Sequence, residues 1–199
     1  MKKLAFIGLT AALLTAGFSS AANETWKIVA DERFSVATVE NNTDIENWTG
    51  RTSKINGEIV FDRTAKTGSV NVTVDGSSID TGVALRNEHM RSGDWLNFDK
   101  DKDIKFISTR VRNTTGDNYA VTGNLTMRGV TKSVTVTGSL KYTAASKVTE
   151  SMGFKGDIVA LSTKLSVKLS DFGVKHPAVD AGRVNDKLDI VLKVIATNK

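Results

Sequence analysis

Hydrophobic and polar residues alternate along most of the chain with the period of two that is typical of β-strands. The stretch VTGNLTMRGVTKSVTVTGSLKY, residues 121–142, shows the pattern twice, with a short turn at its centre. In each half, apolar residues and one glycine share a face, and Thr, Asn and Ser occupy the other. We expect about eight strands in all. The same alternation, broken by Gly, Asn and Asp, gives these further strand candidates: residues 25–41, 55–62, 70–75, 105–112, 153–161, 163–171 and 188–195.

One segment departs from this rhythm. In TGVALRNEHMRSGDWLNF, residues 81–98, apolar and charged residues recur at spacings of three and four. Asp80 or Thr81 suits the start of a helix and Gly93 its end, so we expect one short helix of about three turns near residues 82–93. Many strands without alternating helices predict an all-β sandwich or a closed barrel, and closure removes the unpaired edges that invite aggregation.

The first residues form a unit of their own. Lys2 and Lys3 precede an apolar run, residues 4–18, and small residues follow at 19–22. This order is typical of a secretory signal peptide, with cleavage after Ala21 or Ala22. A membrane anchor is the weaker alternative, because fifteen helical residues rise about 22 Å, less than the roughly 30 Å hydrocarbon core. We therefore expect a signal peptide at 1–21, one domain at 22–199, export to the periplasm and no stable membrane insertion afterwards.

Composition excludes several classes of function. Loss of Lys2 and Lys3 lowers the net charge from +5 to +3, too small and too evenly spread a charge for a nucleic-acid-binding protein. The chain has no cysteine, which excludes disulfides, thiolate catalysis and cysteine-based metal sites. His89 and His176, its two histidines, do not have metal-binding spacing, and no nucleotide- or cofactor-binding motif occurs. We expect no metal and no cofactor.

Glycines interrupt the apolar faces of the predicted strands. Gly123 and Gly138 stand where the alternation places inward side chains, and Gly57 repeats the feature in another strand. With a four-residue loop between the two strands, Gly123 would lie opposite Val136. Relief of strain where a barrel strand bends is one explanation. The other is space for a ligand, because eight strands enclose an interior that can hold one small molecule.

Several stretches, in their order and spacing, resemble one known family. They include DERFSV (residues 31–36) and LSDFGV (169–174), and the most specific are R-x-x-H-M-x-S-x-D-W-L (86–96) and GNLTMRGVTKSV (123–134). Over nearly its whole mature length, the chain resembles the YceI-like family of periplasmic polyisoprenoid-binding, lipocalin-like proteins. The resemblance implies an eight-stranded antiparallel barrel whose pore takes a long isoprenoid tail without catalysis. Phe34 and Leu169 replace residues that are usually polar in the family, which leaves the polar head of the ligand open.

The sequence thus predicts a carrier or sequestering protein for a long-chain amphiphile such as a polyisoprenoid, a quinone-like lipid or a fatty-acid derivative. Arg86 and His89, one helical turn apart, are candidates for contact with the polar head, although a solvated helix face would show the same spacing. The predicted pore lining consists of inward strand positions: Ile59, Phe61, Val72, Val74, Phe106, Val121, Gly123, Leu125, Met127, Val134, Val136 and Gly138.

Two other classes of function remain open at this stage. A hydrolase or isomerase could act on such a lipid through His89 together with Asp94 or Asp99. An adhesion or inhibitor module would instead use the outer strand faces, which carry rows of Thr, Ser and Asn. The pattern also leaves association into a homodimer open.

Overall fold

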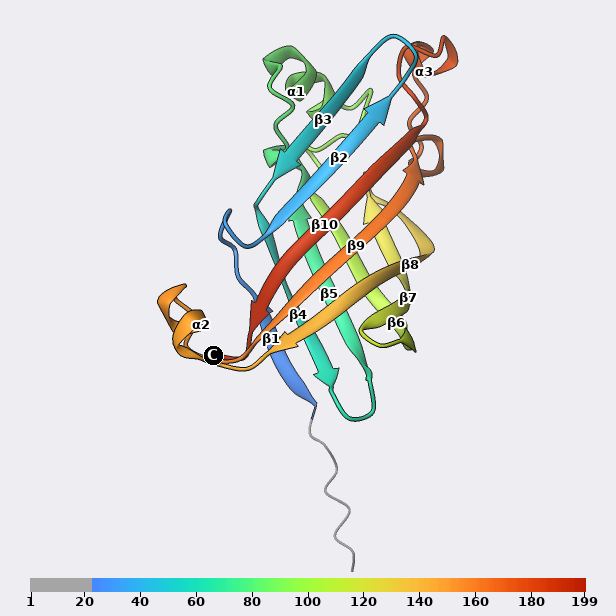
Figure 1. Cartoon of the computed structure of the whole chain (residues 1–199). Coiled ribbons are helices and arrows are strands. Elements are labelled where there is room, and N and C mark those ends of the chain that lie inside the picture. Colours follow the sequence, from blue (N-terminus) through green and yellow to red (C-terminus); the bar gives the residue numbers. More distant parts are fainter. Residues whose placement is uncertain (1–22) are drawn as a thin grey trace, which may run out of the picture.

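In residues 23–199, the part of the chain that the computed structural model describes, ten strands form one antiparallel barrel (Figure 1). The strands are β1 (Glu24–Ile28), β2 (Val36–Asn42), β3 (Asn47–Thr52), β4 (Ile55–Asp62), β5 (Thr67–Asp75), β6 (Asp103–Thr115), β7 (Asn118–Met127), β8 (Val130–Thr143), β9 (Ile158–Lys168) and β10 (Lys187–Thr197). The short helices are η1 (Gly76–Ser78), α1 (Ala84–Arg91), α2 (Lys147–Ser151), η2 (Ser170–Phe172) and α3 (Pro177–Asp180). The predicted signal peptide and its cleavage site lie outside the described residues.

The barrel closes through β10, which is paired along both edges. One edge pairs with β9, and the other pairs first with β2 and then, near its end, with β1. β1 pairs with β4, and β2 pairs with β3. β1 and β2 are therefore two parts of one interrupted strand, and β3 and β4 are two parts of the neighbouring strand. Counted in this way, the described residues form a closed barrel of eight antiparallel strands, which confirms the predicted fold.

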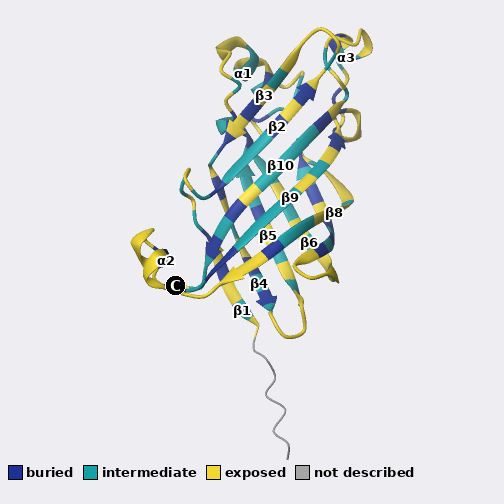
Figure 2. Ribbon diagram, in the orientation of Figure 1, coloured by how far each residue is buried: buried dark blue, intermediate teal, exposed yellow. Residues whose placement is uncertain are grey.

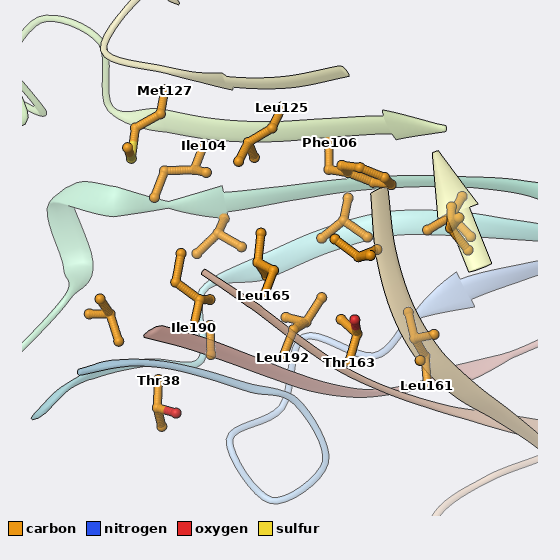
Figure 3. A pocket seen from close by; sticks show the side chains of 18 of the residues that line it. Thr38, Ile104, Phe106, Leu125, Met127, Leu161, Thr163, Leu165, Ile190 and Leu192 are labelled. Atoms are coloured by element: carbon orange, nitrogen blue, oxygen red, sulfur yellow. The ribbon is translucent and has the colours of Figure 1, made fainter. Parts of the chain in front are cut away.

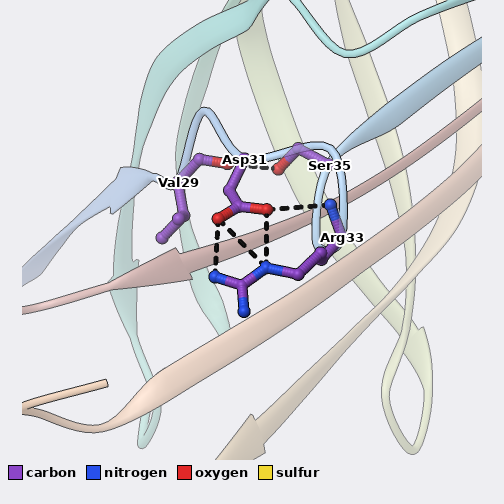
Figure 4. Close-up of polar contacts among 4 residues, drawn as sticks. All are labelled: Val29, Asp31, Arg33 and Ser35. Atoms are coloured by element: carbon purple, nitrogen blue, oxygen red, sulfur yellow. Dashed lines mark hydrogen bonds and ion pairs between the residues drawn. The ribbon is translucent and has the colours of Figure 1, made fainter. Parts of the chain in front are cut away.

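A tight turn divides the strand predicted at residues 25–41, so that prediction of one continuous strand is wrong (Figure 4). The carboxylate of Asp31 accepts hydrogen bonds from the backbone N–H of Arg33, at 2.9 Å, and from its Nη2, at 2.8 Å. Ser35 Oγ donates to the carbonyl oxygen of Val29 at 2.6 Å. The hydrogen bonds from Arg33 hold the pKa of Asp31 at about 2, below its ordinary 3.8. Local hydrogen bonds thus replace the ladder until the strand resumes at Val36.

α1 is shorter than the helix predicted at residues 82–93. It has eight residues, and its N-cap, Val83, makes no side-chain hydrogen bond to the helix. Asp80, one of the two expected starting residues, instead accepts a hydrogen bond from Asn87 Nδ2 at 2.7 Å. The residues before α1 therefore form a loop, and the hydrogen bond between Asp80 and Asn87 attaches this loop to the side of the helix.

The hairpin between β7 and β8 has a two-residue loop, and not the four-residue loop predicted. Arg128 and Gly129 both have positive φ, 55° and 72°, as in the tight turns that suit the twist of a hairpin. The register consequently shifts by two residues, and Gly123 lies opposite Val134 and not opposite Val136. Because the shift is even, each residue keeps its predicted face of the sheet.

β8 and β9 pair over only part of their lengths. Their ladder runs from Thr143 opposite Ile158 to Thr137 opposite Lys164, and residues 130–136 have no ladder partner on β9 in the described chain. Figure 1 shows the two strands diverging there. η2 follows β9 and contacts both strands, with Phe172 buried. Side-chain packing, in place of backbone pairing, closes this part of the wall.

Two apolar clusters lie inside the barrel. One surrounds Trp26 and Val194 and fills the end near β1. The other, beneath α1 and η2, includes Phe98 and Phe172. Phe106 packs against both clusters, and Figure 2 shows buried and exposed positions alternating along the strands that supply them. The strand alternation read from the sequence therefore directs apolar side chains to a shared interior.

Candidate functional site

A cavity of about 180 Å³ lies inside the barrel between facing strands. In Figure 3 the side chains of Leu125, Leu165 and Ile190 point into it from different strands. The wall is almost entirely hydrocarbon, and its few hydroxyl groups include that of Thr163, which donates to the carbonyl oxygen of Thr137 at 2.8 Å. A cavity with such walls offers water few hydrogen-bonding partners, so it favours an apolar occupant.

Strand alternation places most of the predicted lining residues at this cavity. Two of them, Gly123 and Val134, face each other across the β7–β8 ladder and do not border it. Val134 packs instead against the buried cluster beneath η2. The other ten border the cavity: Ile59, Phe61, Val72, Val74, Phe106, Val121, Leu125, Met127, Val136 and Gly138.

The glycines allow neighbouring strands and side chains to approach the backbone closely, and they contribute less to open space in the cavity. A Cβ at Gly123 would lie 2.5 Å from Cζ of Phe106, so this glycine accommodates the Phe106 ring. Gly57 has a φ of 145°, and a Cβ there would lie 2.1 Å from the carbonyl oxygen of Asn71, as expected where a barrel strand bends. Gly138 does border the cavity, but a Cβ there would also meet β9. The interpretation of Gly123 as empty ligand space is therefore wrong.

Part of the lining was not predicted from the sequence. The alternation of β10 was visible in the sequence and could have identified Ile190 and Leu192. The loop after α1 has no such regularity, although it also contributes to the wall. The further residues that border the cavity include Trp48, Met90, Trp95, Leu96, Phe98, Leu161, Leu165, Leu169 and Leu188.

Arg86 lies at the α1 end of the cavity. Its guanidinium stands 5.5 Å from the ring centroid of Trp48, which borders the cavity, and it forms an ion pair with Glu46. The ion pair joins α1 to the turn between β2 and β3. Trp95, which packs against the same buried cluster as Trp48, stacks on His176 with ring centroids 4.1 Å apart, which ties the loop after α1 to the N-cap of α3. This end of the cavity is therefore bordered by two tryptophans with a cation beside one of them.

His89 does not share this position. Its side chain is exposed, and it does not border the cavity. Among the described residues, no hydrogen bond or ion pair joins His89 to Asp94 or Asp99. Asp99 instead forms an ion pair with Arg91, with 3.9 Å between Oδ1 and Nε. Within residues 23–199, no group of three or more His, Asp or Glu side chains is arranged to hold a metal ion. The same residues contain no helix of the length and hydrophobicity needed to cross a bilayer.

Comparison with known proteins decides the family. The model of the YceI-like domain matches residues 26–196, which is nearly all of the barrel. The chain belongs to the YceI family. Among its YceI-family relatives, a UPF0312 protein of Pseudomonas aeruginosa is 33% identical, and the match covers 97% of this chain and 96% of the relative. Protein YceI of Shigella flexneri is 32% identical, with 98% and 97% covered.

Solved structures show the same fold. BcnA of Burkholderia cenocepacia matches with a TM-score of 0.72 and 24% identity, over 82% of this chain and 96% of that one. A polyisoprenoid-binding domain from Saccharophagus degradans matches with a TM-score of 0.60 and 13% identity, over 88% and 99%. The family resemblance read from the sequence motifs is thus confirmed.

Two positions distinguish this YceI-family chain from the pattern expected of its relatives. The ring of Phe34 packs on Phe154, with centroids 4.8 Å apart, so it extends the apolar contacts near the interrupted strand. Leu169 is buried and borders the cavity. Leu169 adds hydrocarbon to the cavity wall where a polar group was expected, whereas Phe34 is half-buried and lies outside the cavity lining.

Proposed function

We propose that this YceI-family protein holds the apolar tail of a long-chain amphiphile inside its barrel, and carries or sequesters that lipid in the periplasm without catalysis. The observation that carries the proposal is the hydrocarbon-lined cavity of about 180 Å³ within a closed barrel. The structural likeness to a polyisoprenoid-binding domain supports the same ligand class. The predicted signal peptide supports the periplasmic location.

The shape of the cavity favours a linear tail. Its volume is below the roughly 300–1,000 Å³ of sites for drug-sized ligands, yet its walls extend from Trp95 in one apolar cluster to Tyr119 in the other. A thin chain can follow such a path. Burying ten methylene groups gives about 8 kcal/mol, and association costs of about 4–15 kcal/mol offset much of it. Useful affinity therefore needs a tail longer than ten carbons, as in a polyisoprenoid.

The polar head is proposed to lie at the α1 end, near Arg86. An anionic head such as a phosphate could compete with the carboxylate of Glu46 for the guanidinium, because Arg presents a fork of N–H donors to either group. His89 is exposed and does not border the cavity, so we do not assign it to the head group. Deeper binding of a charged head is disfavoured, since the lining is apolar around Leu169.

Equilibrium binding of prenyl alcohols of increasing chain length tests the proposal. Affinity should rise with each added isoprene unit, by about fourfold or about 0.8 kcal/mol for each carbon that is buried, until the tail fills the cavity. Affinity that does not depend on chain length would contradict it. The recovered lipid is analysed by mass spectrometry in the same experiment. A chemically altered lipid, with turnover lost in His89→Ala, would favour the enzyme instead.

A further inference from the structure

Three large apolar side chains are exposed at the α1 end of the barrel. Ile45, in the turn between β2 and β3, is 88% exposed, and Val83 and Leu85, at the start of α1, are 44% and 59% exposed. Turns and helix N-caps normally carry Asn, Asp, Ser, Thr or Gly, which hydrogen-bond to the local backbone or adopt unusual dihedrals. Such departures from local preference are expected where function requires them.

These side chains belong to two segments that lie together. The ion pair between Arg86 and Glu46 joins the residue after Leu85 to the residue after Ile45. In Figure 2 both segments stand exposed at the same end of the molecule. We call Ile45, Val83 and Leu85 the apolar rim.

The apolar rim adjoins the cavity. Trp48, three residues after Ile45, is half-buried and borders the cavity, as does Met90 on the buried face of α1. Around the rim, Asp44, Glu46, Asp80 and Glu88 outnumber Arg86 and Arg91, so no excess of positive charge is present to attract an anionic surface. The rim therefore suits a partner surface of low net charge.

We propose that the apolar rim docks on the surface of a zwitterionic lipid bilayer, where the lipid tail passes between bilayer and cavity without crossing bulk water. The inference rests on the proposed function. A protein partner would be expected to meet a central cluster of aromatic or Arg anchors. Here the exposed groups are aliphatic side chains on a turn and a helix start, which can insert shallowly among lipid head groups. Their continuity with a hydrocarbon-lined cavity matches the chemistry of a bilayer interior.

Co-sedimentation with phosphatidylcholine vesicles tests this docking. The rim variant combines Ile45→Ser, Val83→Ser and Leu85→Ser. Its matched control combines Ile107→Ser on β6, Val148→Ser on α2 and Met152→Ser at the C-cap of α2, residues that are 53%, 69% and 41% exposed. The rim variant should lose at least about tenfold in vesicle affinity, the control should bind like the wild type, and added salt should change neither result.

Three results of the vesicle experiment would overturn the proposal. They are equal vesicle binding by the rim variant and the wild type, equal loss in both variants, and binding that appears only with anionic vesicles and disappears in salt. A wild-type dimer that the rim substitutions convert to a monomer would assign the rim to a second copy instead, which also overturns it. Binding of farnesol, a prenyl alcohol whose tail is longer than ten carbons, in solution separates the two proposals. The rim variant should retain it, whereas its absence from the wild type would contradict the proposed function alone.

Discussion

The ring of Phe106 occupies the space beside Gly123, where a Cβ would lie 2.5 Å from Cζ of the ring and 2.6 Å from the carbonyl oxygen of Ile107. The carbonyl belongs to the paired backbone of β6, so it cannot move aside as a flexible side chain could. We expect Gly123→Ala to lower the free energy of unfolding by about 1–3 kcal/mol, the usual cost of overpacking. Urea denaturation measures this change.

Gly93→Ala is the matched control for this substitution. The nearest atom to a Cβ at Gly93 is Oδ1 of Asn97, at 3.6 Å, so its effect should stay within about 0.5 kcal/mol. Phe106→Leu in the Gly123→Ala background should recover part of the loss. Equal effects of the two Ala substitutions would refute the close contact. A Leu at Gly123 would test the cavity poorly, because it would disturb β6 first.

Incomplete pairing of β8 with β9 should appear in hydrogen exchange. Residues 137–139 of β8 are paired with both β7 and β9, whereas residues 130–136 have a ladder partner only on β7 in the described chain. Among residues 130–136, the amides that point away from β7 should exchange fastest. β7, paired on both sides, serves as the internal reference. Uniform protection along β8 would contradict the open ladder.

Substitution of Arg86 should affect recognition of the polar head of the ligand more than the stability of the fold. Arg86→Gln removes an exposed ion pair with Glu46, and such pairs contribute about 0–1 kcal/mol. Preference for a prenyl phosphate over the matching alcohol should decrease in binding assays. Arg63→Gln is a close control, because Arg63 also pairs with an acid, Glu24 at 3.2 Å, and stacks on a ring, that of Tyr142 at 4.1 Å. If both substitutions change the preference equally, the head is not at Arg86.

The turn at Asp31 should lose stability in acid. Its folded pKa of about 2 lies below the ordinary 3.8, so the carboxylate stabilises the fold above about pH 4, and this contribution is lost as the pH falls through 2. NMR titration of the carboxyl carbon should give a midpoint near 2, and Arg33→Gln should move it back toward 3.8. A wild-type midpoint at the ordinary value would show that the bonds to Arg33 do not persist in solution.

The face of each strand could be read from the sequence, but the register could not. Alternation shows that the side chains of Leu125 and Val136 point inward, even when the residue predicted to lie opposite each of them on the neighbouring strand is wrong. The register depends on the φ of Arg128, 55°, and no simple rule assigns a left-handed conformation to an arginine. The cavity wall was therefore predictable strand by strand, whereas the reason for Gly123 needed the position of the Phe106 ring.

Irregular segments escaped prediction for a different reason. β3 has the sequence NWTGRT, in which Trp48 is the only large apolar residue, because Gly50 and Thr52 occupy the other inward positions. The break in the strand at Asp31 depends on hydrogen bonds between residues two to six apart, which leave no trace in hydrophobic periodicity. Contributions of the loop after α1 to the cavity are tertiary contacts, so local patterns could not show them.

Native mass spectrometry of the periplasmically expressed protein tests the central claim most directly. The wild type should carry a long-chain lipid that organic extraction releases. A variant that fills the cavity, Val74→Phe with Val136→Phe, should fold and carry none, while Ile107→Phe on the outer face should carry as much as the wild type. A wild type that holds no lipid and takes none from added prenyl lipid, or a filled variant that carries an equal amount, would contradict the account.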